Sequence, residues 1–208
     1  MKSALIVDDH PVVRAAVKIV LQQEGFRRIY EASTGSEVMA LMRDHAPELV
    51  VLDLVMPSLD GIDVLERIKA SELSSRVLVF TSLDPAFFQE RCMRAGAMAY
   101  VSKTNDLSQL QKAAHAIMAG YTYFAQLSSG PGVPNALQFS EKQMIDSLSN
   151  RELTIFQHLA RGSKNQDIAL HMHLSHKTVS TYKTRLKEKL GLDSAVHLRE
   201  FAMRNQLI

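Results

Sequence analysis

The stretch ALIVDDHP, residues 4–11, places two adjacent carboxylates directly after an apolar run. Two like charges a few ångströms apart repel each other, and each carboxyl group resists ionising beside its neighbour. Asp8 and Asp9 therefore belong either to a solvated loop or to a site where a cation holds them together. The positions of other polar residues along the chain distinguish these two interpretations.

Apolar runs of this kind recur along residues 1–122, and amphipathic helical patterns separate them. The runs are Ala4–Val7, Arg27–Ala32, Leu49–Leu52, Val77–Phe80 and Ala99–Val101. The helical patterns cover Val12–Gln23, Ser36–His45, Ile62–Ser71, Ala86–Arg94 and Leu107–Met118. Two runs, LVVL and VLVF, are apolar at every position, which is typical of strands covered on both faces. Five strand–helix units in series predict an α/β domain with a five-stranded, doubly wound parallel sheet.

Four of the five runs are followed by side chains that can bind a cation or a phosphate group. These are Asp8 and Asp9 after the first run, Asp53 after the third, Thr81 after the fourth and Lys103 after the fifth. Because the carboxyl ends of parallel strands meet at one edge of a sheet, we expect these side chains to lie together. Three carboxylates offer the oxygen ligands that Mg²⁺ prefers, so we predict a metal-binding acidic pocket. For the same reason we expect His10 to be a loop residue rather than a ligand.

Residues 123–145 interrupt the alternation. The triplet Gly130-Pro131-Gly132 and Pro134 disfavour both helix and sheet, so we predict a linker here. Residues 146–208 then carry only helical patterns, which predict a second, all-α domain. Its expected helices run from a cap at Ser149 to Gly162, over 165–171, from a cap at Ser175 to Leu190, and over 196–205.

Charge is divided unevenly between these parts, although the net charge of the 208 residues is only +2. Residues 145–208 hold ten Lys and Arg against six Asp and Glu, a charge of +4 that leaves −2 for the rest.

The single cysteine, Cys92, excludes an intramolecular disulfide framework. The N-terminus lacks a signal-peptide pattern, and no apolar segment approaches the ~20 residues that span a bilayer. We therefore expect a cytoplasmic protein that contacts no membrane and has a different partner for each half.

The acidic set, with Tyr100 shortly before Lys103, resembles the receiver domain of two-component response regulators, a flavodoxin-like fold. The resemblance implies that Asp53 accepts a phosphoryl group from a histidine kinase or a histidine-phosphotransfer module. It implies Mg²⁺ held by Asp8, Asp9, Asp53 and the backbone carbonyl of Val55. It also implies that the phosphoryl-contacting and switch residues are Thr81, Tyr100 and Lys103. Many receivers have proline after the lysine, whereas Thr104 stands here, which leaves the isomer of this peptide bond open.

The segment LSNRELTIFQHLARGSKNQDIALHMHLSHKTVSTYKTRLKEKLGL, residues 148–192, resembles the helix-turn-helix of NarL/FixJ/LuxR-type regulators. The resemblance makes the helix after Ser175 the one that enters the major groove of double-stranded DNA. The expected DNA contacts are Lys177, Ser180, Thr181, Lys183, Thr184, Arg185 and Lys187. The three hydroxyl side chains are candidates for base edges, and the four cations are candidates for phosphates.

Both halves together resemble a DNA-binding response regulator, nearest the branch of BvgA and EvgA, on the strings AGYTYF, LSNREL and KTVSTYKTRL. The resemblance implies a transcription regulator that is not an enzyme and that acts as a homodimer, with RNA polymerase as a further partner. Its expected organisation is a receiver domain over 1–122, a linker over 123–145 and a LuxR-type domain over 146–208. Two alternatives remain open: a DNA-binding regulator that is independent of phosphorylation, and a Mg²⁺-dependent aspartyl phosphatase.

Overall fold

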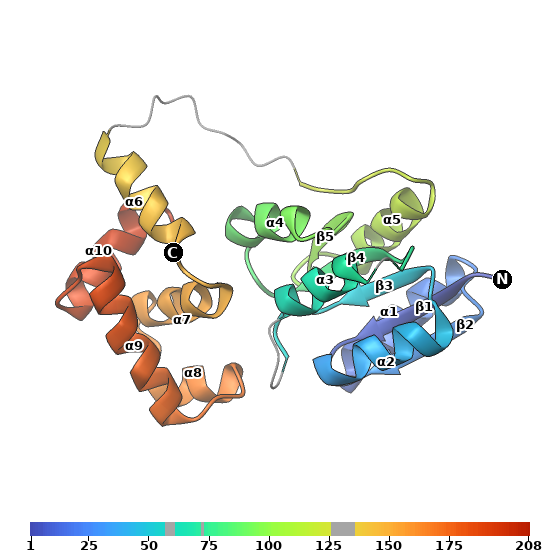
Figure 1. The fold of residues 1–208 in the computed structure, drawn as a ribbon, viewed down its shortest axis with the longest axis horizontal. Helices are drawn as coiled ribbons and strands as arrows, with labels where there is room; N and C mark the ends of the chain where they lie inside the picture. Colours follow the sequence, from blue (N-terminus) through green and yellow to red (C-terminus); the bar gives the residue numbers. More distant parts are fainter. Residues whose placement is uncertain (57–60, 72, 126–135) are drawn as a thin grey trace. The chain divides into compact units, whose positions relative to one another are not determined.

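The computed structural model describes residues 1–56, 61–71, 73–125 and 136–208. The chain divides into two compact units, Met1–Leu127 and Ser128–Ile208 (Figure 1). The first unit holds the sheet, and the second follows it along the chain.

The first unit is built on five parallel strands, in the order β2-β1-β3-β4-β5. The strands are β1 (Ser3–Val7), β2 (Arg28–Ala32), β3 (Leu49–Leu52), β4 (Arg76–Thr81) and β5 (Ala99–Ser102). All four residues of β3 are buried, as its uninterrupted apolar sequence predicts. The predicted five-stranded parallel sheet is thus confirmed.

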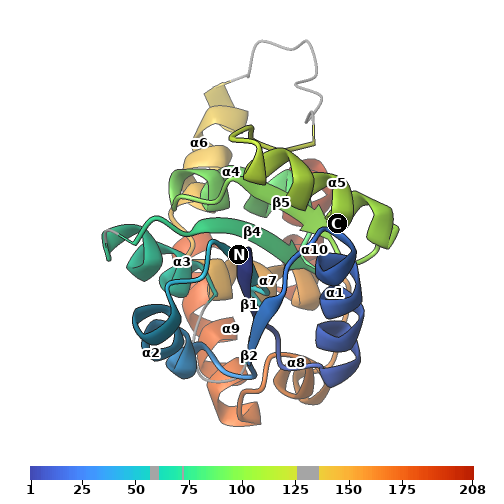
Figure 2. The same ribbon diagram turned by 90° about the vertical axis from the view of Figure 1, so that its right-hand side faces the viewer.

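Helices cover both faces of this sheet, so it is doubly wound as predicted. The helices are α1 (Pro11–Gln23), α2 (Gly35–His45), α3 (Gly61–Ala70), α4 (Pro85–Arg94) and α5 (Leu107–Met118). Helices α1 and α5 pack together on one face, and α2, α3 and α4 follow one another on the other (Figure 2). On the first of these faces, Ile6, Val51 and Leu78 of the sheet pack with Leu110 and Ile117 of α5 in the hydrophobic core.

The segment that follows α5 pairs with the edge of the sheet, which the predicted linker over 123–145 does not anticipate. Tyr123 forms an isolated parallel bridge with Ala99 of β5, and the backbone of Ala125 bonds to Gln89 of α4. A second difference lies at the other end, where Ala136–Asp146 forms helix α6. The prolines and glycines that argue against a helix all precede Ala136 and lie outside the described residues.

The described part of the second unit, residues 136–208, is built of helices, as predicted. They are α6, α7 (Asn150–Ala160), α8 (Asn165–His171), α9 (His176–Leu190) and α10 (Ala195–Arg204). Helix α7 packs against α8, α9 and α10, and the rings of Phe156 and Phe201 meet edge to face in its core. Helix α6 is joined to the end of α10, because the Glu141 carboxylate accepts bonds from Arg204 and Asn205.

Capping residues fix where α7 and α9 begin and where α9 ends. Ser149 and Glu152 form the predicted capping box of α7: Glu152 Oε2 accepts from the Ser149 N–H at 2.9 Å, and Ser149 Oγ accepts from the Glu152 N–H at 3.3 Å. Ser175 caps α9 by accepting from the Thr178 N–H, and Gly191 ends it in the left-handed conformation.

Within the described ranges, no helix has both the length and the apolar character needed to cross a membrane.

Candidate functional site

The carboxyl ends of the strands bring the predicted acidic residues to one edge of the sheet. Val7 and Leu52 are register partners in β1 and β3, so Asp8 and Asp53, which follow them, are neighbours. The Asp53 N–H donates to the Val7 carbonyl at 2.9 Å, which fixes the backbone where β3 ends. On the other side, the Lys103 N–H donates to the carbonyl of Thr81 at 2.8 Å and ties β5 to β4.

The side chains of these residues form a compact charged cluster. Lys103 Nζ lies 2.6 Å from Asp53 Oδ2 and 2.8 Å from Asp8 Oδ2. Both carboxylates are almost fully enclosed, with 2% of Asp53 and 3% of Asp8 exposed. One ammonium group is therefore shared by two buried carboxylates that would otherwise repel each other.

Burial and the neighbouring opposite charge shift the pKa of Asp53, and likewise that of Lys103, in opposite directions. Burial raises the pKa of the Asp53 carboxyl, and the nearby Lys103 ammonium opposes part of that rise. Burial alone would lower the pKa of Lys103, but the charges and hydrogen bonds of Asp53 and Asp8 outweigh it, so the net shift is upward. Lys103 therefore stays protonated in the pocket. A buried carboxylate beside a fixed ammonium is suited to accept an anionic group such as a phosphoryl group.

Four residues of this edge could hold a metal ion. Ligand atoms of Asp8, Asp9, His10 and Asp53 all lie within 4.8 Å of one another. The His10 ring is largely exposed, yet its Nδ1 lies 2.7 Å from Asp9 Oδ1, so the expected loop residue lies against the carboxylates. Three carboxylates at this spacing fit a hard divalent cation, which prefers oxygen ligands. Val55 follows Asp53 by two residues, and its N–H donates to Asp53 Oδ1 at 3.2 Å.

Two residues that sequence reasoning missed hold the backbone of this pocket in place. A Cβ atom on Gly61, the first residue of α3, would lie 2.4 Å from Leu54 Cα and 2.7 Å from the Asp53 carbonyl oxygen. Only glycine allows this approach, because the obstacle is backbone. Arg14 of α1 donates from Nη1 to the Asp8 carbonyl at 2.8 Å. Both contacts join the first or second turn of a helix to the end of the strand before it, six to eight residues away along the chain.

The predicted switch residues are linked through the loop between β4 and α4. Thr81 is fully buried, and its hydroxyl oxygen accepts from the Leu83 N–H at 3.4 Å. The Tyr100 hydroxyl donates to the Leu83 carbonyl at 2.9 Å. Burial raises the pKa of Tyr100, so this hydroxyl remains a donor. No peptide bond among the described residues is cis, and the bond between Lys103 and Thr104 is trans.

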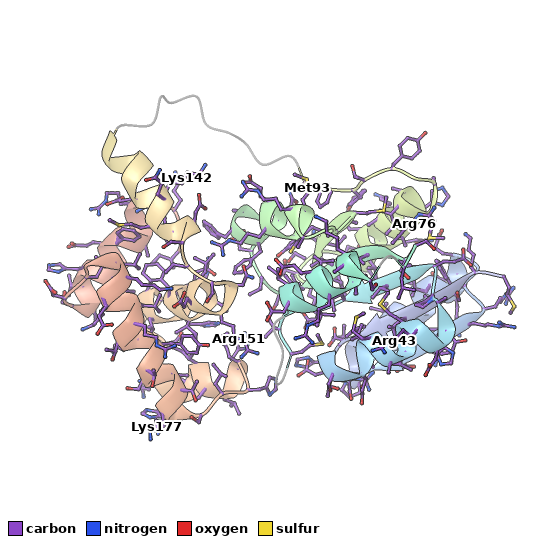
Figure 3. All side chains as sticks on the ribbon, viewed as in Figure 1. Arg43, Arg76, Met93, Lys142, Arg151 and Lys177 are labelled. Atoms are coloured by element: carbon purple, nitrogen blue, oxygen red, sulfur yellow. The ribbon has the colours of Figure 1, made fainter. Side chains whose placement is uncertain are left out.

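Helix α9 presents a polar stripe of side chains to solvent. Five of the seven predicted DNA contacts are exposed on it: Lys177, Ser180, Thr181, Thr184 and Arg185. Figure 3 shows Lys177 at the start of the helix, pointing away from the neighbouring helices. The other two, Lys183 and Lys187, are half-buried. His176 is exposed beside Lys177, and the sequence reasoning did not select it.

Several polar groups of α9 already have partners within the unit. The Thr181 hydroxyl donates to the Lys177 carbonyl and the Thr184 hydroxyl to the Ser180 carbonyl, so their oxygens remain available as acceptors. Lys187 Nζ donates to the Asp193 carbonyl at 2.9 Å. Lys189 Nζ donates to the nearly buried Glu152 carboxylate at 2.7 Å, which ties the end of α9 to the start of α7.

Comparison with known proteins places the two parts of the chain in known families. Residues 4–115 match the response regulator receiver domain, and residues 146–202 match the luxR family of bacterial regulatory proteins. The transcription regulator BvgA of Bordetella pertussis is 46% identical over 203 residues, covering 98% of this chain and 97% of BvgA. The DNA-binding transcriptional activator EvgA of Escherichia coli K12 is 34% identical over 205 residues, covering 99% of each.

A solved structure leads to the same family. The crystal structure of a LuxR-family two-component response regulator from Aurantimonas sp. SI85-9A1 is 30% identical to this chain, with a TM-score of 0.56. The match covers 68% of this chain and 96% of that structure.

Proposed function

Because this chain belongs to the LuxR family of two-component response regulators, we propose that phosphorylation of Asp53 controls how its α9 helix binds DNA. The observation that carries the proposal is the buried ion pair of Asp53 and Lys103, which shares its ammonium with Asp8. Such a site holds a nucleophilic carboxylate in a fixed position beside a positive charge. Residues 1–122 then carry the phosphoacceptor function, residues 146–208 carry DNA binding, and residues 123–145 connect them.

The reaction transfers a phosphoryl group from a histidine nitrogen of the donor to an Asp53 carboxylate oxygen. The P–N bond breaks while the new P–O bond forms, so catalysis is largely positioning and charge neutralisation. Lys103 neutralises the incoming phosphoryl oxygens, and Thr81 donates a hydrogen bond to one of them. The donor is a histidine kinase or a histidine-phosphotransfer protein.

Mg²⁺ is the ion that this donor set supports. Asp8, Asp9, Asp53 and the Val55 carbonyl would hold it, and the Mg²⁺ charge would balance the phosphoryl oxygens. The exclusion of bulk water from Asp8 and Asp53 strengthens every charge interaction at this edge.

The DNA contacts are divided between base edges and phosphates. Ser180, Thr181 and Thr184 lie on the exposed stripe of α9, where short hydroxyl side chains reach base edges in the major groove. The expected phosphate contacts are Lys177, Lys183, Arg185 and Lys187. The two half-buried lysines of this set are at the margin of the stripe, so we expect Lys177 and Arg185 to contribute most.

The assembled regulator is expected to be a cytoplasmic homodimer. Its DNA sites then contain two half-sites, since a dimer presents two recognition helices. RNA polymerase is a further proposed partner, since a regulator that activates transcription from a nearby site can do so by contacting the polymerase.

The first experiment is intact-mass measurement after incubation with acetyl phosphate and Mg²⁺. Wild type and Asp44→Asn, a control at an exposed carboxylate on α2, should each gain one phosphoryl group. Asp53→Asn should gain none. Labelling of Asp53→Asn equal to wild type would contradict the proposal. Steady release of phosphate from a phosphomonoester would instead support the aspartyl phosphatase alternative.

A further inference from the structure

The segment after α5 is attached to helix α4 by one buried side chain. Gln89 is 6% exposed, and its amide makes two bonds with the backbone of one residue. Its Nε2 donates to the Ala125 carbonyl at 2.9 Å, and its Oε1 accepts from the Ala125 N–H at 3.0 Å. We call this pair of bonds the Gln89 clamp. The clamp gives both the donor and the acceptor of the buried Gln89 amide a hydrogen-bond partner on the backbone of Ala125.

The same segment is also bonded to the edge strand. The Tyr123 N–H donates to the Met98 carbonyl at 2.9 Å, and the Tyr123 carbonyl accepts from the Tyr100 N–H at 3.0 Å. The Tyr123 hydroxyl donates to Gln109 of α5. Tyr123 and Ala125 are therefore held by contacts with α4, β5 and α5.

These contacts continue the chain of bonds that begins at the acidic pocket. Thr81 is bonded to Leu83, and Leu83 to the hydroxyl of Tyr100. The backbone of Tyr100 is bonded to Tyr123, two residues before Ala125. Helix α4, which carries Gln89, begins at Pro85, directly after the same loop. A movement of the loop at Leu83 can therefore reach the segment that contains Tyr123 and Ala125 by two routes, one through Tyr100 and one through α4.

We propose that the Gln89 clamp restrains the linker in the unphosphorylated protein, and that phosphorylation of Asp53 opens it. This inference rests on the proposed phosphorylation. When Thr81 turns towards the phosphoryl group, it pulls on the loop at Leu83 and shifts the start of α4. Ala125 is exposed, so water replaces the broken bonds at its backbone and a modest shift suffices to open the clamp. Ala125 then loses its attachment to α4, which removes that restraint on the chain that leads to the DNA-binding unit.

Amide hydrogen exchange of the wild-type protein tests this directly, with beryllofluoride and Mg²⁺ as the phosphoryl mimic. The clamp predicts faster exchange at Ala125 when the mimic is added, because its N–H loses the Gln89 acceptor. Faster or slower exchange at Leu83 with no change at Ala125 would overturn the inference while leaving the proposed function intact. No change at either segment would contradict the proposed function and the inference with it.

Variants of Gln89 provide the functional test. Gln89→Leu removes both bonds at similar volume, and Gln89→Glu keeps only an acceptor for the Ala125 N–H. The matched control is Gln111→Leu on α5, where the glutamine amide bonds to Glu24 rather than to the linker. All three variants should accept phosphate from acetyl phosphate at the wild-type rate.

The readout is DNA affinity with and without phosphorylation. Gln89→Leu should raise the affinity of the unphosphorylated protein by about fivefold or more, the lower end of usual allosteric coupling, and should shrink the gain from phosphorylation. Gln89→Glu should lie between Gln89→Leu and wild type, and Gln111→Leu should match wild type. Unchanged or weaker binding by unphosphorylated Gln89→Leu would overturn the inference, as would an equal effect of Gln111→Leu.

Discussion

The acidic pocket and helix α9 hold their charged side chains in opposite ways. In the pocket, Lys103 lies within 2.8 Å of two carboxylates that are almost fully buried. On α9, Lys177 and Arg185 are exposed to solvent. A buried charge needs neighbouring groups to compensate for the loss of water around it, whereas a solvated charge contributes little to the stability of the fold. The difference teaches that pocket substitutions should change stability and chemistry together, while substitutions of the exposed cations on α9 should change DNA binding alone.

The largest effect is expected for Lys103→Met, which leaves Asp8 and Asp53 buried without their shared cation. Removal of one partner from a buried ion pair costs about 3 kcal/mol in the free energy of unfolding. Urea denaturation without metal should show this loss, and Mg²⁺ should restore part of it by replacing the missing charge. Phosphorylation by acetyl phosphate should also slow by at least about a hundredfold, comparable to losing one preorganised electrostatic contact. Wild-type stability in the variant would contradict the account.

Gly61→Ala should damage the pocket without changing any charge. Its Cβ would lie 2.4 Å from Leu54 Cα and 2.7 Å from the Asp53 carbonyl, so the backbone that carries Asp53 must move. Overpacking of this kind typically costs about 1–3 kcal/mol. Urea denaturation should report the loss, and the rate of phosphorylation should fall with it. If stability and phosphorylation both remained at wild-type values, the close approach would not be what positions Asp53.

A partly buried histidine in the DNA-binding unit extends the comparison. The rings of His158 on α7 and His171 on α8 meet at 4.9 Å. Burial, together with the charges of His171 and Arg161, lowers the pKa of His158 to about 4. Below pH 6.5 the unfolded chain therefore binds a proton that the folded chain resists, and stability falls as the pH drops towards 4.

The loss at pH 4.5 should be about 1–2 kcal/mol relative to pH 7, allowing for the part of the ring that water reaches. Denaturation curves of His158→Gln should show less pH dependence than wild type by that amount. His197→Gln, at an exposed position of α10, is the matched control and should behave as wild type. An identical pH dependence in all three proteins would show that His158 does not titrate as described.

The smallest effect on stability is expected for Lys177→Met, the counterpart of Lys103→Met on α9. Its exposed ammonium should contribute nothing measurable to folding, so urea denaturation should match wild type. Binding to DNA should weaken for all sequences, and the dependence of log affinity on log salt should decrease by about one. A stability loss comparable to that of Lys103→Met, or an unchanged salt dependence, would remove the distinction between the two regions.

The strands and the acidic residues could be predicted because their signals are local. The run LVVL is apolar at all four positions and became β3 with unchanged bounds. Once parallel strands are inferred, the meeting of Asp8, Asp53 and Lys103 follows from topology alone. The ends of helices in the second unit could likewise be predicted, because Ser149 and Ser175 cap helices through their side-chain hydroxyls and Gly191 ends α9 in the left-handed conformation.

The residues that were missed act through tertiary contacts. Gly61 matters because the backbone after Asp53 passes within 2.7 Å of where its Cβ would be, and Gln89 because Ala125 returns to α4. Helix α6 was not predicted, because the prolines and glycines before Ala136 led us to assign the whole stretch 123–145 to a linker. Its attachment through Glu141 to the end of α10 joins residues that are 63 and 64 positions apart.

The central claim is that phosphorylation of Asp53 changes DNA binding by α9. The most direct measurement is the affinity for a DNA site selected from a random pool by the phosphorylated protein, with and without acetyl phosphate and Mg²⁺. Wild type should bind at least about fivefold more tightly after phosphorylation, while Asp53→Asn should show one affinity under both conditions. If wild type bound equally with and without phosphorylation, or if Asp53→Asn still responded to acetyl phosphate, the account would be contradicted, and the first result would favour a phosphorylation-independent regulator.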